Sequence, residues 1–435
     1  MKKLLLGVCL LLSATLALAQ IPKKTEQEVL LAIQQGDNAH AMQLLQVWAE
    51  RGDARAQYNL GLMYYVGRGV VQDYARAREW FEKAAEQGHA KAQYNLGVMY
   101  RDGQGVAQDD TKAREWFEKA AAQGFAKAQY NLGVVYRDGR CVAQDYAKAR
   151  SWFEKAAAQG DAKAQYNLGA MYETGRGVAQ DYAKAREWFE KAAAQGFAKA
   201  QNNLGVMYRD GQGVVQDNVK ACEWFEKAAA RGDAGAQNNL GLMYYDGHGV
   251  AQNYAKAREW WEKAAAQRDT DAQYNLGVMY SAGRGVAQDS AKAREWWEKA
   301  AAQGYARAQS NLGVMYHDGQ GVAQDYAKAR EWWEKAAVQG YARAQTNLGV
   351  MYYRGRGGAQ DYAKAREWWE KAAAQGNADA QYNLGVVYEN GKGVTKDLFK
   401  AREWYEQVAA QRENAENAEV VRKARQALEK MRHGC

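Results

Sequence analysis

The feature that most constrains this chain is a stretch of 36 residues that recurs ten times at constant spacing. The first copy is Ala54–His89, and each copy contains the triplet Asn-Leu-Gly. A constant period of this length is typical of stacked helical repeats, in which each copy packs against its neighbours. The even repeat therefore predicts one elongated array rather than separate globular domains. The triplet glycine recurs at Gly61, Gly97, Gly133, Gly169, Gly205, Gly241, Gly277, Gly313, Gly349 and Gly385.

The first half of each copy predicts a helix. In the first copy Leu60 and Met63 lie three residues apart, on one helical face. A turn that starts at Gly67 then ends the helix, because glycine readily adopts the left-handed conformation required at a helix C-terminus. Gly61 lies inside this helix, where glycine costs about 1 kcal/mol relative to alanine. Because this cost recurs in every copy, we expect a neighbouring helix to approach closely at this point.

The second half of each copy predicts another helix. Asp73 is the expected N-cap, and Glu79 and Lys83 have the spacing of an exposed ion pair. Two adjacent aromatic residues follow, Trp-Phe in the first five copies (Trp80-Phe81 in the first), Trp-Trp in the next four and Trp-Tyr in the last. Large aromatic residues that face small ones are expected to interdigitate in a layered core.

These residues carry a family resemblance. Most copies follow the pattern A-x-A-Q-x-N-L-G-x-M-Y-x-x-G-x-G-V-x-Q-D-Y-x-K-A-x-x-W-x-x-K-A-A-x-Q-G. Over residues 54–413 the chain resembles the Sel-one-like repeat (SLR) family, a relative of the tetratricopeptide repeat. The resemblance implies an all-α fold, a right-handed α-α superhelix of ten helix-turn-helix repeats. It also implies use as a scaffold or adaptor for other proteins.

The N-terminal residues 1–19 have the composition of a signal peptide. Lys2 and Lys3 precede the apolar stretch Leu4–Leu16, and Ala17-Leu18-Ala19 forms a cleavage site. The apolar stretch is short for a membrane-spanning helix, so we expect no integral membrane segment in the mature chain. The short form of the signal is typical of bacteria. We therefore expect a periplasmic or secreted protein.

The ends of the repeat array are expected to be capped. Residues 20–53 predict capping helices that form a degenerate half-repeat, with Trp48 in the aromatic position. Residues 54–413 hold the ten repeats, and residues 414–435 predict a C-terminal capping helix. Atypical terminal units are what a stack needs to cover its exposed ends.

Composition and charge exclude some partners. The formal net charge is +8, but basic and acidic residues alternate along the second helix of each copy and neutralise each other locally. A nucleic-acid footprint requires a clustered basic stripe, so we expect no nucleic-acid partner. We also expect no cofactor and a monomeric chain, with a protein or peptide as the partner.

Residues with catalytic or metal-binding chemistry are scattered. The mature chain contains Cys141, Cys222 and Cys435 at unlike places in the repeats, so no disulfide framework is predicted. The five histidines show no metal-ligand spacing and are expected to be solvated surface residues: His40, His89, His248, His317 and His433. We therefore expect no enzyme activity. The alternative is a cell-envelope hydrolase acting on β-lactams or peptidoglycan, as described for cysteine-rich relatives of the family.

The candidate binding residues lie on the first helix of each copy, away from its apolar stripe. In tetratricopeptide arrays the equivalent face lines the inner groove. An amide side chain offers one acceptor and two donors, so an Asn series could hold the backbone of an extended peptide. That series is Asn59, Asn95, Asn131, Asn167, Asn203, Asn239, Asn275, Asn311, Asn347 and Asn383. Tyrosines next to it could supply flat contacts: Tyr58, Tyr94, Tyr130, Tyr166, Tyr274 and Tyr382.

Two alternatives remain open at these positions. The Asn series, with the equally invariant Gln57 series, could instead bond a neighbouring helix and hold the stack together. The position of Tyr65 varies among copies as Arg, Glu, Ser, His or Tyr, and the position of Tyr58 becomes Asn, Ser or Thr in four copies. Partner-specific contact and unconstrained drift both explain this variation. Our hypothesis is an exported solenoid that binds a protein or peptide along its concave face.

Overall fold

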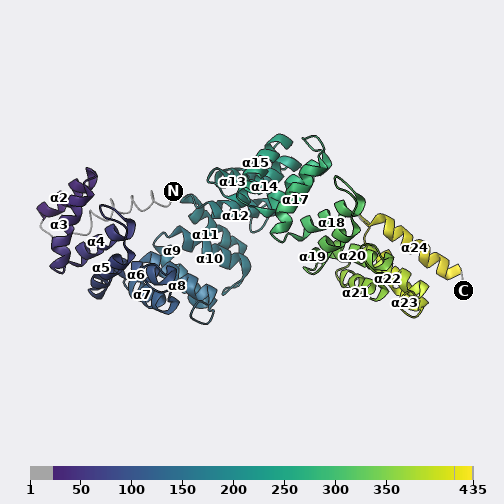
Figure 1. The fold of residues 1–435 in the computed structure, drawn as a ribbon, viewed down its shortest axis with the longest axis horizontal. Helices are drawn as coiled ribbons and strands as arrows, with labels where there is room; N and C mark the ends of the chain where they lie inside the picture. The colour runs from purple at the N-terminus through teal and green to yellow at the C-terminus, as the bar shows by residue number, and fades with distance from the viewer. Residues whose placement is uncertain (1–22, 416, 434–435) are drawn as a thin grey trace. The chain divides into compact units, whose positions relative to one another are not determined.

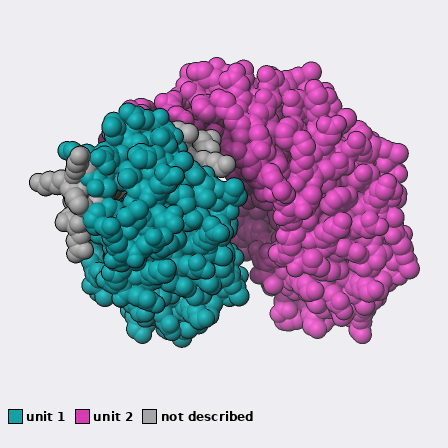
Figure 2. All heavy atoms as spheres, turned by 60° about the vertical axis from the view of Figure 1, so that its left-hand side comes forward, with its two compact units in different colours: residues 1–217 teal, residues 218–435 magenta. Residues whose placement is uncertain are grey.

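The computed structural model describes residues 23–415 and 417–433. These residues form 23 helices and no strand (Figure 1). The chain divides into two compact units, Met1–Asp217 and Asn218–Cys435, called unit 1 and unit 2 below (Figure 2). The fold predicted from the repeat is therefore confirmed, an all-α solenoid of helical hairpins.

Each repeat contains two helices, called the A helix and the B helix. In unit 1 two leading helices, α2 (Lys23–Gln34) and α3 (Asn38–Glu50), precede α4 (Ala54–Val66), α5 (Tyr74–Glu86), α6 (Ala90–Asp102), α7 (Asp110–Ala122), α8 (Ala126–Asp138), α9 (Tyr146–Ala158), α10 (Ala162–Thr174), α11 (Tyr182–Ala194) and α12 (Ala198–Asp210). The A helices of unit 1 are α4, α6, α8, α10 and α12.

Unit 2 continues the same alternation and ends on one additional helix. Its helices are α13 (Asn218–Ala230), α14 (Ala234–Asp246), α15 (Tyr254–Ala266), α16 (Thr270–Ala282), α17 (Ser290–Ala302), α18 (Ala306–Asp318), α19 (Tyr326–Ala337), α20 (Ala342–Arg354), α21 (Tyr362–Ala373), α22 (Ala378–Asn390), α23 (Leu398–Ala409) and α24 (Ala418–His433). The A helices of unit 2 are α14, α16, α18, α20 and α22.

Local signals in the sequence set the helix boundaries. Gly67 ends α4 with φ of 71°, in the left-handed conformation, and its N–H donates to the Met63 carbonyl. Asp73 begins α5 by accepting a hydrogen bond from the Arg76 backbone N–H. Both predictions are confirmed. The caps satisfy backbone groups that would otherwise lack a partner at the helix ends.

The triplet glycine allows close approach of the two helices in a hairpin. A Cβ atom on Gly61 would lie 2.7 Å from Cδ1 of Phe81, and one on Gly277 would lie 2.3 Å from Nε1 of Trp297. Both distances are well below van der Waals contact, so any larger residue would push the B helix away. Phe81 is fully buried and Trp297 is 6% exposed. The sequence prediction that small and large residues interdigitate here is confirmed.

The first aromatic residue of each pair has a different environment from the second. Trp80 is partly exposed, and the Lys83 ammonium lies 4.1 Å from its ring centroid. The B-helix ion pair forms instead between Arg78 and Glu82, at 3.5 Å. The predicted pair of Glu79 with Lys83 is therefore wrong, because the cation–π contact engages the lysine.

Helices precede and follow the ten repeats in the described chain, at the places where we expect caps. Leu45 of α3 is 1% exposed and lies 36 residues before Phe81, so it fills the buried aromatic position of the first hairpin. Trp48, which we had assigned to that position, is partly buried and lies under the Arg51 guanidinium. At the other end, Val421 of α24 is fully buried in the last apolar cluster.

The predicted signal peptide, residues 1–19, lies outside the described residues. Among the helices that are described, none is both long enough and apolar enough to cross a bilayer.

Candidate functional site

The candidate surface is formed by A-helix side chains that lie away from the apolar stripe of the A helix, although Tyr58 and Tyr65 also pack against Phe81 of the B helix. We define the A-helix face of a unit as the positions equivalent to Arg55, Tyr58, Asn59, Leu62 and Tyr65 of the first repeat. Successive A helices within a unit follow one another along the stack (Figure 1), so each position recurs as a row along the face.

The buried glutamine of each A helix joins successive hairpins. Gln57 Nε2 donates to the carbonyl of Ala49 on the preceding helix, at 3.1 Å, and its Oε1 accepts from Gln87 Nε2 at 2.8 Å. The same donation to the preceding helix is made by Gln57, Gln93, Gln129, Gln165, Gln201, Gln237, Gln273, Gln309, Gln345 and Gln381. The glutamine series therefore holds the stack together, as one of our alternatives stated.

The predicted asparagine series lies at the inner edge of the A-helix face. Asn59, Asn131 and Asn167 are each 8% exposed. The remaining seven are partly buried: Asn95, Asn203, Asn239, Asn275, Asn311, Asn347 and Asn383. In unit 2, Asn275 Nδ2 donates to Asn238 Oδ1 at 3.1 Å. Some of these amides therefore bond within the stack.

The predicted tyrosines also lie on this face, each beside the next repeat. Tyr58 is 8% exposed, and Tyr94, Tyr130, Tyr166, Tyr274 and Tyr382 are partly buried. Burial raises the pKa of Tyr130, whereas Arg137, and a hydrogen bond from Asn167 of the next repeat, lower it. Burial likewise raises the pKa of Tyr274 and the Asn311 side chain lowers it. The structure therefore brings the two predicted series together across repeats.

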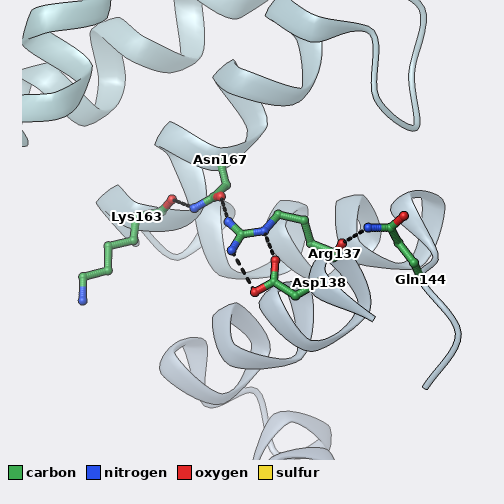
Figure 3. Close-up of polar contacts among 5 residues, drawn as sticks. All are labelled: Arg137, Asp138, Gln144, Lys163 and Asn167. Carbon is green, nitrogen blue, oxygen red and sulfur yellow. Dashed lines mark hydrogen bonds and ion pairs between the residues drawn. The ribbon is translucent and has the colours of Figure 1, made fainter. Parts of the chain in front are cut away.

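A polar cluster in unit 1 shows how the series connect (Figure 3). Arg137 at the end of α8 donates from Nη1 to Asn167 Oδ1 on α10, at 2.6 Å. Its Nε donates to Asp138 Oδ1 at 2.7 Å. Asn167 Nδ2 donates in turn to the backbone carbonyl of Lys163, at 2.7 Å, while the Lys163 side chain extends away from the other four residues. The amide of Asn167 is occupied within the protein.

The variable position of Tyr65 contacts the turn of the next repeat. The Tyr65 hydroxyl donates to Gln104 Oε1, and Arg284 Nη1 donates to the Tyr245 hydroxyl at 3.0 Å. Each contact joins residues 39 positions apart. Part of the variation at the Tyr65 position is therefore explained by the residue that it contacts in the turn of the next repeat. This cause of the variation was not predicted from the sequence, because the contact joins two repeats.

Two adjoining hollows lie on the A-helix face of unit 2. One of about 320 Å³ is lined by residues that include Tyr274 on α16 and Asn311 on α18. The second, of about 230 Å³, is lined by residues that include Asn347 on α20. Val314 and Arg343 line both hollows. Three of the predicted site residues therefore line hollows large enough for side chains of a partner.

Two histidines have structural roles rather than being solvated. His89 caps α6 through Nδ1, which accepts from Ala92 N–H at 3.3 Å, and it stacks on Tyr58. Burial, followed by the charges of Lys91 and Arg55, lowers its pKa to about 4. His317 contacts Asp318 at 2.6 Å and Arg356 at 3.1 Å. Our prediction of a solvated surface residue is wrong for both.

Groups with catalytic chemistry do not converge in the described residues. No cluster of three or more His, Cys, Asp or Glu side chains is placed to hold a metal ion within them. Cys141 and Cys222 are free thiols. His317 and Asp318 line the second hollow, whose lining includes no serine, threonine or cysteine, whereas Ser281 lines the first hollow. The β-lactam hydrolase alternative gains no support from this arrangement.

The hairpins, their constant register and their shared A-helix face define an α-solenoid repeat protein. A family profile, the Sel1 repeat, matches all ten copies at residues 54–89, 90–125, 126–161, 162–197, 198–233, 234–269, 270–305, 306–341, 342–377 and 378–412. The chain therefore belongs to the Sel1 repeat family, which confirms the resemblance noted in the sequence.

Solved structures agree with this assignment. A protective antigen present in uropathogenic Escherichia coli strains, which displays an SLR fold, is 42% identical; the match covers 85% of this chain and 79% of that chain, with a TM-score of 0.68. A Sel1 repeat protein from Oxalobacter formigenes is 37% identical over 71% of this chain and 90% of that chain, with a TM-score of 0.57. None of the curated proteins matched the chain.

Proposed function

We propose that this protein is an exported interaction scaffold that binds a protein or an extended peptide along the A-helix face, on the concave side of the solenoid, without catalysis. The solenoid fold of the Sel1 repeat family suggests protein partners. The observation that carries the proposal is the pair of adjoining hollows in unit 2, which Tyr274, Asn311 and Asn347 line together with Arg343.

The chemistry of this lining suits a peptide. Arg343 is exposed and Asn311 and Asn347 are partly buried, so their polar atoms are within reach of an approaching backbone. Tyr274 and the edges of Trp297 and Trp333 add apolar area. Aromatic residues and arginine are enriched at protein interfaces because they combine large contact area with hydrogen bonding.

We infer a location outside the cytoplasm from the composition of residues 1–19. The similar Escherichia coli protein is a protective antigen, which supports export of this chain as well. Fractionation of cells into cytoplasm, periplasm and culture medium tests this part of the proposal. Retention of the uncleaved chain in the cytoplasm would contradict it.

A pull-down from envelope extract with a double variant tests the binding face. Asn311→Ala with Asn347→Ala removes two amides from the hollows, and we expect loss of the partners recovered by the parent protein. The matched control is Lys292→Ala with Lys328→Ala, two exposed residues at the starts of B helices in the same unit. Equal recovery of every partner by the parent protein and both double variants would contradict a role for this face.

A further inference from the structure

The A-helix faces of the two units differ in charge. The five A helices of unit 1 carry eight Lys and Arg residues and four Asp and Glu residues. The five A helices of unit 2 carry three Lys and Arg residues and five Asp and Glu residues. The B-helix sequences, by contrast, alternate the two signs throughout the array. An acidic or a basic partner is therefore expected to bind the A helices of one unit better than those of the other.

The excess of positive charge in unit 1 comes from a single row. The position of Arg55 is basic in every repeat of the unit, and none of these five side chains forms an ion pair with another described residue. The arginines at the other end of the A helices are neutralised, because Arg101 and Arg137 each contact the next aspartate at 2.7 Å. The row is Arg55, Lys91, Lys127, Lys163 and Lys199.

The basic row lies beside the predicted tyrosine contacts. The Lys163 ammonium is 5.8 Å from the ring centroid of Tyr130 on the preceding A helix. Two members of the row also act on His89, since Lys91 and Arg55 both lower its pKa after the larger effect of burial. In unit 2 the same row reads Gly235, Asp271, Arg307, Arg343 and Asp379 and has no net sign.

The distance between successive basic residues in the row indicates which kind of charged chain fits it. Packed helices lie about 10 Å apart, so successive row members along one unit are separated by roughly that distance. An extended peptide advances about 3.3 Å per residue, so three of its residues span one repeat. A nucleic-acid strand carries a charge about every 3.4 Å along its axis, which is far denser than one cation per repeat.

We propose that the A-helix face of unit 1 binds an extended acidic peptide with a carboxylate at about every third residue. Each carboxylate pairs with one member of the row, and the neighbouring tyrosines and asparagines contact the intervening residues. This inference rests on the proposed function, which assigns peptide binding to the A-helix face, and adds the chemical class of the peptide for unit 1.

Fluorescence anisotropy with the full chain and three labelled probes tests the inference. The first probe is a peptide of about 15 residues, the length that spans five repeats at three residues each, with glutamate at every third position. The second has the same composition with its glutamates contiguous, and the third replaces every glutamate by glutamine. Single-stranded oligothymidine serves as a nucleic-acid comparison, and light scattering detects self-association of the chain.

Two triple variants locate the binding surface. Lys127→Ala, Lys163→Ala and Lys199→Ala combined remove three members of the row. The control combines Lys112→Ala, Lys148→Ala and Lys184→Ala, which changes the net charge equally on B helices of the same unit. An exposed ion pair changes an equilibrium constant by roughly two- to fivefold, so we expect about tenfold weaker binding for the row variant. The control should change affinity by less than about twofold, and added salt should weaken the parent complex.

The outcomes separate this inference from the proposed function. Equal affinity for the glutamate and glutamine probes, lost with the Asn311→Ala and Asn347→Ala pair, would overturn the acidic preference but keep the peptide-binding face. Equal loss of affinity in the row and control variants would overturn the assigned surface. Tighter binding of oligothymidine, preference for contiguous glutamates, or a charge-dependent dimer would each overturn the assigned partner.

Discussion

The two units fill the same core position with different side chains, and the difference explains variation on the candidate face. In unit 1 the buried aromatic is phenylalanine, as in Phe153, which packs against Tyr130 at a centroid distance of 5.9 Å. In unit 2 it is tryptophan in four repeats, and the indole N–H reaches a backbone carbonyl of the A helix. Trp333 Nε1 donates to the Ser310 carbonyl at 3.1 Å, and Trp369 Nε1 donates to the Thr346 carbonyl at 3.0 Å.

Where the buried aromatic residue is the larger tryptophan, the residue at the Tyr58 position of the A helix is usually smaller. The position of Tyr58 holds tyrosine above four phenylalanines of unit 1, but asparagine, serine or threonine above Trp261, Trp333 and Trp369. Tyr274 above Trp297 and Asn202 above Phe225 are exceptions. Because the interior is close-packed, volume added on the B helix must be removed nearby. Part of the variation at the Tyr58 position, which we attributed to partner contact or drift, is therefore explained by the size of the buried aromatic residue on the B helix.

Removal of the buried aromatic is expected to give the largest effect and to test whether the two units depend on it equally. Phe153→Ala and Trp333→Ala should each lower the free energy of unfolding by about 3–5 kcal/mol, through lost burial and a residual cavity. Chemical denaturation followed by circular dichroism measures this. A loss below about 1 kcal/mol in one unit would show that its hairpins do not rest on this residue.

A change of pH should act in opposite directions on α6 of unit 1 and α16 of unit 2. The lowered pKa of His89 means that this side chain binds fewer protons in the folded state than in the unfolded state between pH 6.5 and about 4. Stability is therefore lost across that window, by at most about 3 kcal/mol. Burial raises the pKa of Asp269 in unit 2, with Asp271 and Asp233 adding to the rise, so acidification relieves a cost there.

Hydrogen exchange of peptides from α6 and α16, corrected for the intrinsic effect of pH, measures both responses. His89→Asp is the matched control, because Asp161 caps α10 at the equivalent position. In this variant the loss between pH 6.5 and 4 should disappear from α6. A loss of the same size in the variant would show that His89 is not its source.

Substitution of the triplet glycine tests the close approach in each unit. Helix propensity alone predicts that Gly133→Ala and Gly313→Ala stabilise by about 1 kcal/mol. We expect destabilisation by about 1–3 kcal/mol instead, because the new Cβ atoms would lie 2.4 Å from Phe153 and Trp333. The sign of the change in denaturation midpoint decides between the two, and stabilisation would contradict the packing described here.

An exchange of aromatic type tests the volume argument directly. Phe153→Trp should destabilise unit 1 by about 1–3 kcal/mol while Tyr130 is present. With Tyr130→Ser added, the double variant should recover at least about 1 kcal/mol of that loss in a double-mutant cycle. Additive effects of the two substitutions would show that the positions are independent.

Glycine substitutions in two turns, one in each unit, are expected to change stability least. Cys141 and Arg268 have φ of 54° and 67° at positions where other repeats have glycine. Cys141→Gly and Arg268→Gly should each stabilise the chain by about 1 kcal/mol, because glycine adopts this conformation without strain. Thermal unfolding measures the gain. A lower melting temperature for both variants would show that the side chains make compensating contacts.

The fold could be predicted because the same signals for helix ends and helix packing occur in each of the ten repeats. Gly67 and Asp73 mark helix ends by local chemistry, and Gly61 opposite Phe81 predicts close packing without knowledge of the tertiary structure. The capping helix was harder to align, since Trp48 suggested the aromatic position that Leu45 fills. A single degenerate copy does not fix its register.

The candidate site was less predictable because its roles depend on contacts between repeats. The sequence could not distinguish Gln57, which bonds the stack, from Asn59 two residues later. His89 gave no sign of burial, since its environment comes from Tyr58 on the preceding A helix. The hollows beside Arg343 arise from three successive A helices and have no local signature in the sequence.

Site-specific photo-crosslinking in the producing cell tests most directly whether the A-helix face holds the partner. A photoreactive residue placed at Lys163 or Arg343 on A helices should capture the partner, whereas one placed at the equally exposed Lys184 or Lys364 on B helices should not. Capture of the same partner with equal yield from the B-helix positions, or from those positions alone, would contradict binding at the A-helix face.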